Sequence, residues 1–177
     1  MLKRVGVTIT AERFGVAAEL FDEFMTVMET GEFSRALTEP VYDEENGETE
    51  PQQMEMFCNG RLRLTDTDFS LTYEESELTG MEGSESQLSF RREDRGLVTM
   101  LRTGSVTTAL VFEKGKRHMC VYQTPYMPFE VCVHTLRVDN RLALDGRIGG
   151  TLDLDYVIEI RGARAERCQM HIEIREM

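Results

Sequence analysis

Short runs in which apolar and polar residues alternate, separated by turn residues, fill the chain from residue 54 to its end and limit the folds open to it. A period of two is typical of strands that bury one face. The clearest run is 151–161, where Leu, Leu, Tyr, Ile and Ile alternate with polar or acidic residues. The expected strands cover residues 5–10, 54–65 with a break at Gly60, 69–75, 84–91, 97–103, 105–113, 116–124, 129–139, 141–148, 151–161 and 167–175. The pattern therefore predicts an all-β fold.

The connections between these runs are short and rich in Gly, Asn and Asp, as antiparallel hairpins require. A sheet of about eight to ten antiparallel strands has to hide its edges, and closure into a barrel removes them. The 177 residues are enough for one such domain, which we expect to span 1–177. A barrel of this size has room for one small ligand.

Residues 11–53 differ from the rest of the chain. They hold 12 acidic and two basic side chains, a net charge of −10 out of a total of −12. Apolar residues recur at helical spacing, as do acidic residues on the opposite face. The apolar stripe is Phe14, Ala17, Ala18, Phe21, Phe24, Met25 and Met28. We therefore expect 11–53 to be an acidic insertion, a helix followed by a loop, whose apolar stripe packs on the barrel.

Composition excludes several classes of function. The acidic charge argues against nucleic acid as a partner, because phosphate binding needs a basic surface. No run of about 18 apolar residues is present to span a bilayer, so we expect no membrane association. The first residues lack the pattern of a signal peptide, which favours a cytoplasmic protein. The four cysteines form no CxxC pair, so reduced thiols are expected.

Several short motifs carry a resemblance to a known family. They are the residues 73–83, Arg102-Thr103-Gly104, Phe112-Glu113, 122–126, Thr135 and Tyr156. In pattern and order the chain from Met54 to its end resembles the YwiB-like family, a group of bacterial proteins with a lipocalin-like (calycin) β-barrel and no assigned function. The resemblance implies that fold and leaves the ligand open. Two departures are Met127, where the family is expected to have glycine, and the insertion 11–53 in place of a short hairpin.

Two groups of residues are candidates for chemistry. Arg102 follows Val98 and Met100 in alternation, and it is either inside the barrel or on its surface, since both faces of this strand are apolar. An inward guanidinium needs a partner, which could be Glu74, Glu82 or an anionic ligand. The acidic residues within 73–82, which include Glu75 and Glu77, could bind a cation or do acid–base work, or they could form a solvated turn.

Two further features of the sequence have both a functional and a structural explanation, and the structural one is the simpler in each case. The segment 122–129, with two prolines and three aromatic residues, is either a rim that presents Tyr126 and Phe129 to a ligand or a packed corner. His118 and Cys120, with Cys132 and His134 on a neighbouring strand, could in principle form a soft metal site. Adjacent strands often bring such groups together without a metal, so no metal and no cofactor are expected.

These observations lead to three hypotheses about function. The first is non-catalytic binding of a small, partly apolar molecule in the barrel, with an anionic group as the option that Arg102 suggests. The second is a side-chain-filled barrel that binds a protein partner or forms a homodimer. The third, an enzyme that uses Glu74 or Glu82 with Arg102, has no recognised catalytic motif behind it. The candidate ligand-binding residues are Tyr73, Glu74, Glu82, Arg102, Tyr122, Thr124, Tyr126 and Tyr156.

Overall fold

Ten strands make up the structure, a computed structural model that describes residues 1–16, 51–79, 81–160 and 164–177. The strands are β1 (Leu2–Val16), β2 (Gln52–Leu64), β3 (Asp68–Glu74), β4 (Glu85–Arg91), β5 (Leu97–Thr103), β6 (Thr108–Glu113), β7 (Arg117–Gln123), β8 (Pro128–Asn140), β9 (Gly149–Ile160) and β10 (Arg164–Glu176). A short 3-10 turn, η2 (Glu77–Thr79), follows β3. No helix in the described ranges is long and apolar enough to cross a membrane.

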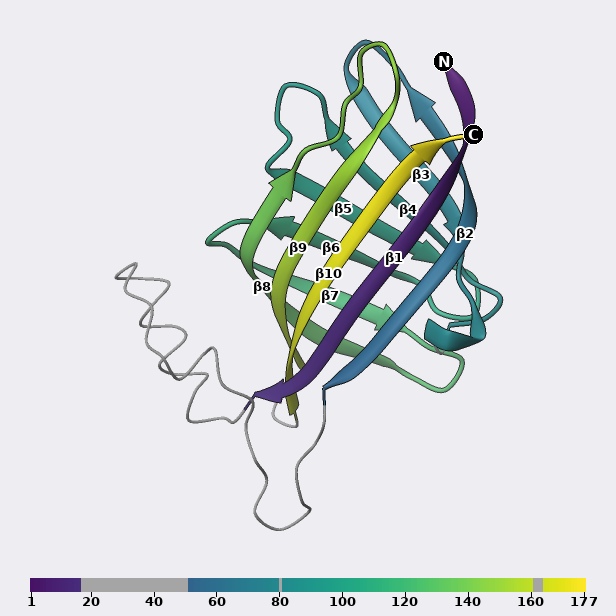
Figure 1. Cartoon of the computed structure of the whole chain (residues 1–177). Helices are drawn as coiled ribbons and strands as arrows, with labels where there is room; N and C mark the ends of the chain where they lie inside the picture. The colour runs from purple at the N-terminus through teal and green to yellow at the C-terminus, as the bar shows by residue number, and fades with distance from the viewer. Residues whose placement is uncertain (17–50, 80, 161–163) are drawn as a thin grey trace.

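All ten strands belong to one antiparallel sheet that curls into a nearly closed barrel (Figure 1). The order is β6-β5-β4-β3-β2-β1-β10-β9-β8-β7, so that β1 and β10 lie side by side in its middle. The two edge strands meet where Thr107 and Gln123 exchange backbone hydrogen bonds of 3.0 and 2.8 Å. The predicted all-β antiparallel barrel is confirmed.

The barrel interior is packed by side chains from all ten strands, because alternate residues of each strand point inward. Gly60 on β2 faces inward, where a Cβ atom would lie 2.7 Å from Leu71 Cδ1 and 2.8 Å from Val7 Cγ2. Gly60 pairs with Val5 on one side and Tyr73 on the other. The predicted break at Gly60 is therefore wrong: β2 continues through it, because the glycine makes room for its neighbours.

The predicted helical insertion is wrong at both of its ends. β1 continues through Val16, with residues 11–13 paired to both β2 and β10, and β2 already begins at Gln52. Strand pairing on two sides outweighs the local helical spacing that included Phe14. The rest of the proposed helix and loop, from residue 17 to residue 50, lies outside the described residues.

The predicted strand 141–148 is also wrong. This segment connects β8 to β9 and contributes a single isolated bridge, between Ala143 and Gly149. Its apolar residues Leu142, Leu144 and Ile148 are buried in the core cluster. The alternation seen in the sequence therefore reflects apolar side chains that a loop tucks into the core.

Candidate functional site

Polar side chains gather in the barrel interior at the end where β1 stops and β2 begins. Arg102 is one of them: on β5 it continues the inward row of Val98 and Met100, and only 7% of its side chain is exposed. Of the two orientations left open by the sequence, the inward one is correct. A guanidinium in such a place has to be compensated, because an isolated buried charge is costly.

The partner of Arg102 is Glu75, the residue directly after β3. Its Oε1 accepts hydrogen bonds from Arg102 Nη2 at 3.1 Å and from Arg102 Nε at 3.2 Å. Ser86 on β4 donates its hydroxyl to the same oxygen at 2.5 Å, and 2% of the Glu75 side chain is exposed. The three residues form a buried cluster in which the two charges neutralise each other.

The two carboxylates expected from the sequence lie elsewhere. Glu74 points outward from β3, opposite Glu85, and is exposed. Glu82 is exposed in the turn before β4, where its backbone oxygen accepts a hydrogen bond from Ser105. Neither makes a hydrogen bond or ion pair with Arg102, so the expectation that one of them is its partner is wrong. The alternation that placed Tyr73 inside also directs Glu75, two residues later, to the same face, and the sequence interpretation did not use this signal.

Three of the predicted tyrosines belong to the same part of the interior: Tyr73 and Tyr122 lie near Arg102, and Tyr156 lies near Tyr122. Tyr73 and Tyr156 are buried, and Tyr122 stacks on Phe129 with ring centroids 5.4 Å apart. Burial raises the pKa of all three phenols above the ordinary value. Arg102 and Arg13 act against this effect at Tyr122. The hydroxyls therefore stay neutral and are hydrogen-bond donors at physiological pH.

Arg13 is a residue of this cluster that the sequence interpretation missed. It follows Val7, Ile9 and Ala11 in the inward row of β1, and it is paired in register with Cys168 on β10. Burial works to lower the pKa of Arg13, but its neighbours, above all Cys168 and Tyr156, give a net rise. The carboxylate of Glu166 on β10 also raises the pKa of Arg13. Continuing the strand alternation beyond residue 10 was the signal that could have found it.

Thr124 and Tyr126 do not join the polar side chains described above. We call that group the interior cluster: Arg13, Tyr73, Glu75, Ser86, Arg102, Tyr122 and Tyr156. Thr124 Oγ1 accepts hydrogen bonds from the backbone N–H groups of Tyr126 and Met127 at 3.3 and 3.2 Å, and donates to Met127 O at 2.8 Å. It thereby shapes the turn between β7 and β8. Tyr126 is 95% exposed, whereas Phe129 packs against Tyr122. This segment is a structured corner with one exposed tyrosine.

The four cysteines, Cys58, Cys120, Cys132 and Cys168, are free thiols. Cys58 lies at the same end of the interior as Glu75, and burial, together with that carboxylate, raises the pKa of its thiol to about 11. Cys120 also belongs to the inner core, whereas Cys132 and His134 alternate with the inward Val131 and Val133 and so lie on the outer face of β8. The histidine and cysteine residues considered in the sequence are thus divided between two faces.

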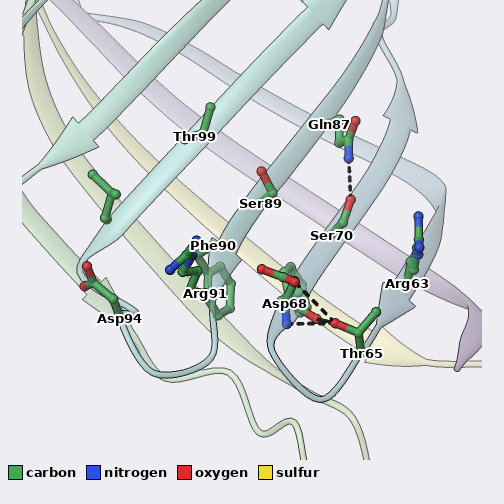
Figure 2. Close-up of a pocket in the computed structure, with 12 residues that line it drawn as sticks. Arg63, Thr65, Asp68, Ser70, Gln87, Ser89, Phe90, Arg91, Asp94 and Thr99 are labelled. Atoms are coloured by element: carbon green, nitrogen blue, oxygen red, sulfur yellow. Dashed lines mark hydrogen bonds between the residues drawn. The ribbon is translucent and has the colours of Figure 1, made fainter.

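A hollow of about 440 Å³ lies on the outer side of β2–β5, away from all of the predicted site residues (Figure 2). Short polar side chains line it, and Gln87 Nε2 donates a 2.6 Å hydrogen bond to Ser70 Oγ across two strands. Its lining also contains two arginines and two aspartates, whose charges offset each other. This balance provides no charge preference for a ligand, and the interior cluster remains the better candidate.

Comparison with known proteins agrees with the barrel and leaves the chemistry open. Residues 39–172 match the family model described as "Domain of unknown function (DUF1934)". The crystal structure of the YwiB protein from Bacillus subtilis has a similar fold, with a TM-score of 0.60 over 96% of this chain and 92% of that chain. The two sequences are 14% identical, so the likeness concerns the fold. No curated protein sequence matches the chain.

Proposed function

For this member of the DUF1934 family, the YwiB-like proteins of unknown function, we propose that the interior cluster binds a small molecule with an anionic group and an apolar part, at the end of the barrel where Arg13 and Tyr122 are partly exposed. The proposal does not involve catalysis. The observation that carries it is the inward guanidinium of Arg13, which lies near the neutral phenols of Tyr122 and Tyr156 and interacts with the carboxylate of Glu166 without the direct ion pair that Arg102 forms with Glu75.

The charges at this end of the barrel favour an anion. Glu75 neutralises Arg102 through a direct ion pair, whereas Arg13 interacts with Glu166 without one and is the guanidinium that remains available to a ligand. Arginine binds carboxylate and phosphate groups through two parallel hydrogen bonds, and a ligand of that kind would offset the cost of the partly buried charge of Arg13. Tyr122 and Tyr156 interact electrostatically with Arg13, and their neutral hydroxyls can donate to the same anionic group.

The apolar part of the ligand would contact the aromatic walls beside these hydroxyls. Phe112 packs against Tyr156 with ring centroids 4.8 Å apart, and Phe129 stacks on Tyr122. Sites for small molecules are typically apolar, with a few polar groups that orient the ligand. An aromatic or aliphatic carboxylate or sulfonate fits this description.

The fluorescent probe 8-anilinonaphthalene-1-sulfonate, which combines an apolar ring system with an anionic group, tests the proposal. We expect it to bind the folded protein, and 4-phenylbutyrate to displace it. The Arg13→Gln variant should bind the probe at least about tenfold more weakly, which corresponds to losing about 1.4 kcal/mol of a charge-assisted contact. Fluorescence titration measures both affinities.

The matched control is Arg61→Gln, which removes an arginine from the outer face of β2. Its affinity for the probe should equal that of the unchanged protein. Equal weakening by the two variants would mean that the probe responds to net charge alone. Binding that Arg13→Gln leaves unchanged would remove the interior cluster from the site.

A second candidate function, association of two copies, has an observation of its own. Outward side chains across β5–β7 are apolar and accessible, among them Leu101, Met119 and Val121, and Met119 is 64% exposed. Exposed apolar patches often mark interfaces.

If a homodimer uses this face, light scattering after size exclusion should give twice the 20.3 kDa mass of the chain. Met119→Lys should return the monomer, whereas Phe57→Lys, on β2, should not; a monomeric unchanged protein would rule the candidate out.

A further inference from the structure

The outer face of β8 and β9 holds a second cluster of potentially functional side chains. Cys132 and His134 point outward from β8, where they alternate with the inward Val131 and Val133. Glu159 on β9 is the register partner of Cys132. Strand pairing thus places a thiol, an imidazole and a carboxylate side by side, on the face opposite the interior cluster.

We propose that Cys132, His134 and Glu159 bind a divalent transition-metal ion of the zinc type. One potential ligand atom from each residue lies within 4.8 Å of the other two, and His134 Nε2 is 3.8 Å from Glu159 Oε2. Zinc bound at about 2.0–2.3 Å from N, O and S ligands in a tetrahedron requires ligand atoms roughly 3.3–3.7 Å apart. Small side-chain adjustments therefore suffice to complete the coordination.

The combination of ligands selects the class of metal. Thiolate and imidazole favour zinc, cobalt and similar ions, whereas magnesium and calcium prefer sites made of oxygen alone. Binding requires the Cys132 S–H bond to lose its proton to solvent, so that a sulfur–metal bond can form. One thiolate and one carboxylate then balance the two positive charges of the ion.

The surroundings of the cluster fit a site that is closed on one side. His134 is completely buried and Cys132 is 6% exposed, while 30% of the Glu159 side chain remains accessible. An ion can therefore reach the cluster past Glu159. Three protein ligands leave the fourth tetrahedral position to water or to another ligand. Arg117, the register partner of His134, is exposed and adds a positive charge nearby, which works against the binding of a cation.

Cobalt titration of the full chain under reducing conditions tests the proposal. Co²⁺ should bind with a stoichiometry of one, and should produce a thiolate-to-cobalt charge-transfer band together with the strong visible bands of tetrahedral coordination. Zinc should displace cobalt and remove both sets of bands. Absence of the charge-transfer band in the folded protein would overturn the proposal.

Three variants assign the ligands. Cys132→Ser should abolish the charge-transfer band, while Cys120→Ser, which removes a thiol from the inner face of neighbouring β7, should keep it. Glu159→Gln, at the accessible side of the cluster, should retain the fold and weaken cobalt binding at least tenfold. A band that persists in Cys132→Ser, or an affinity unchanged in Glu159→Gln, would contradict the assignment. If Cys132→Ser does not fold, the Glu159→Gln result decides.

Discussion

Replacing Arg102 by leucine is expected to destabilise the barrel by about 3–5 kcal/mol, because breaking a buried ion pair leaves the other charge without its partner. In this case the charge left behind is that of Glu75, whose side chain is nearly inaccessible and would keep only the hydroxyl of Ser86. If Arg102 faced inward without Glu75, Arg102→Leu would instead be expected to stabilise the barrel, because it would remove an unpaired buried charge. Since the chain has no Trp, urea unfolding is best followed by the circular dichroism of the sheet.

The control for this prediction is the double variant Arg102→Leu/Glu75→Leu, which removes both charges. Apolar residues that replace a whole buried pair are often neutral or stabilising, so the double variant should recover most of the stability lost in the single variant. If Arg102→Leu alone is as stable as the unchanged protein, the pair does not hold this end of the barrel together. Equal losses in the single and double variants would point to packing as the cause.

Replacing Gly104 by alanine is expected to cost about 2–5 kcal/mol, from backbone strain and overpacking together. Gly104 has a φ of +127°, and an added Cβ would lie 2.8 Å from Ser84 Cα and closer still to the backbone of Gly83. Ser84 O accepts the backbone hydrogen bond of Glu75, so displacing this segment also disturbs the partner of Arg102. Urea unfolding measures the effect.

Gly115→Ala is the matched control for Gly104→Ala. Gly115 has a φ of +78° but open space around its Cβ position. Its substitution should cost only the backbone strain, about 1–2 kcal/mol. If the two variants are equally stable, the close approach of Gly104 to residues 83–84 is not important for the fold.

The sequence determined the class of fold and the direction of many side chains. Alternation with a period of two identified most of the strands and placed Tyr73, Tyr122 and Tyr156 on inward faces, because the face of a strand residue is a local property. The same pattern misled where apolar residues had another reason to alternate. In 141–148 they belong to a loop over the core, and around Phe14 a helical spacing coincided with a long strand.

Only the tertiary structure decided which residues meet. Arg102 lies on a strand with two apolar faces, so its orientation depended on the register of β4–β6, and its contact with Glu75 depended on how β3, β4 and β5 align. Glu159 joins Cys132 and His134 through the register of the consecutive strands β8 and β9, and Arg13 meets Cys168 across a pairing of strands separated by most of the chain. Such pairings are set by long-range register, which a local pattern carries no information about.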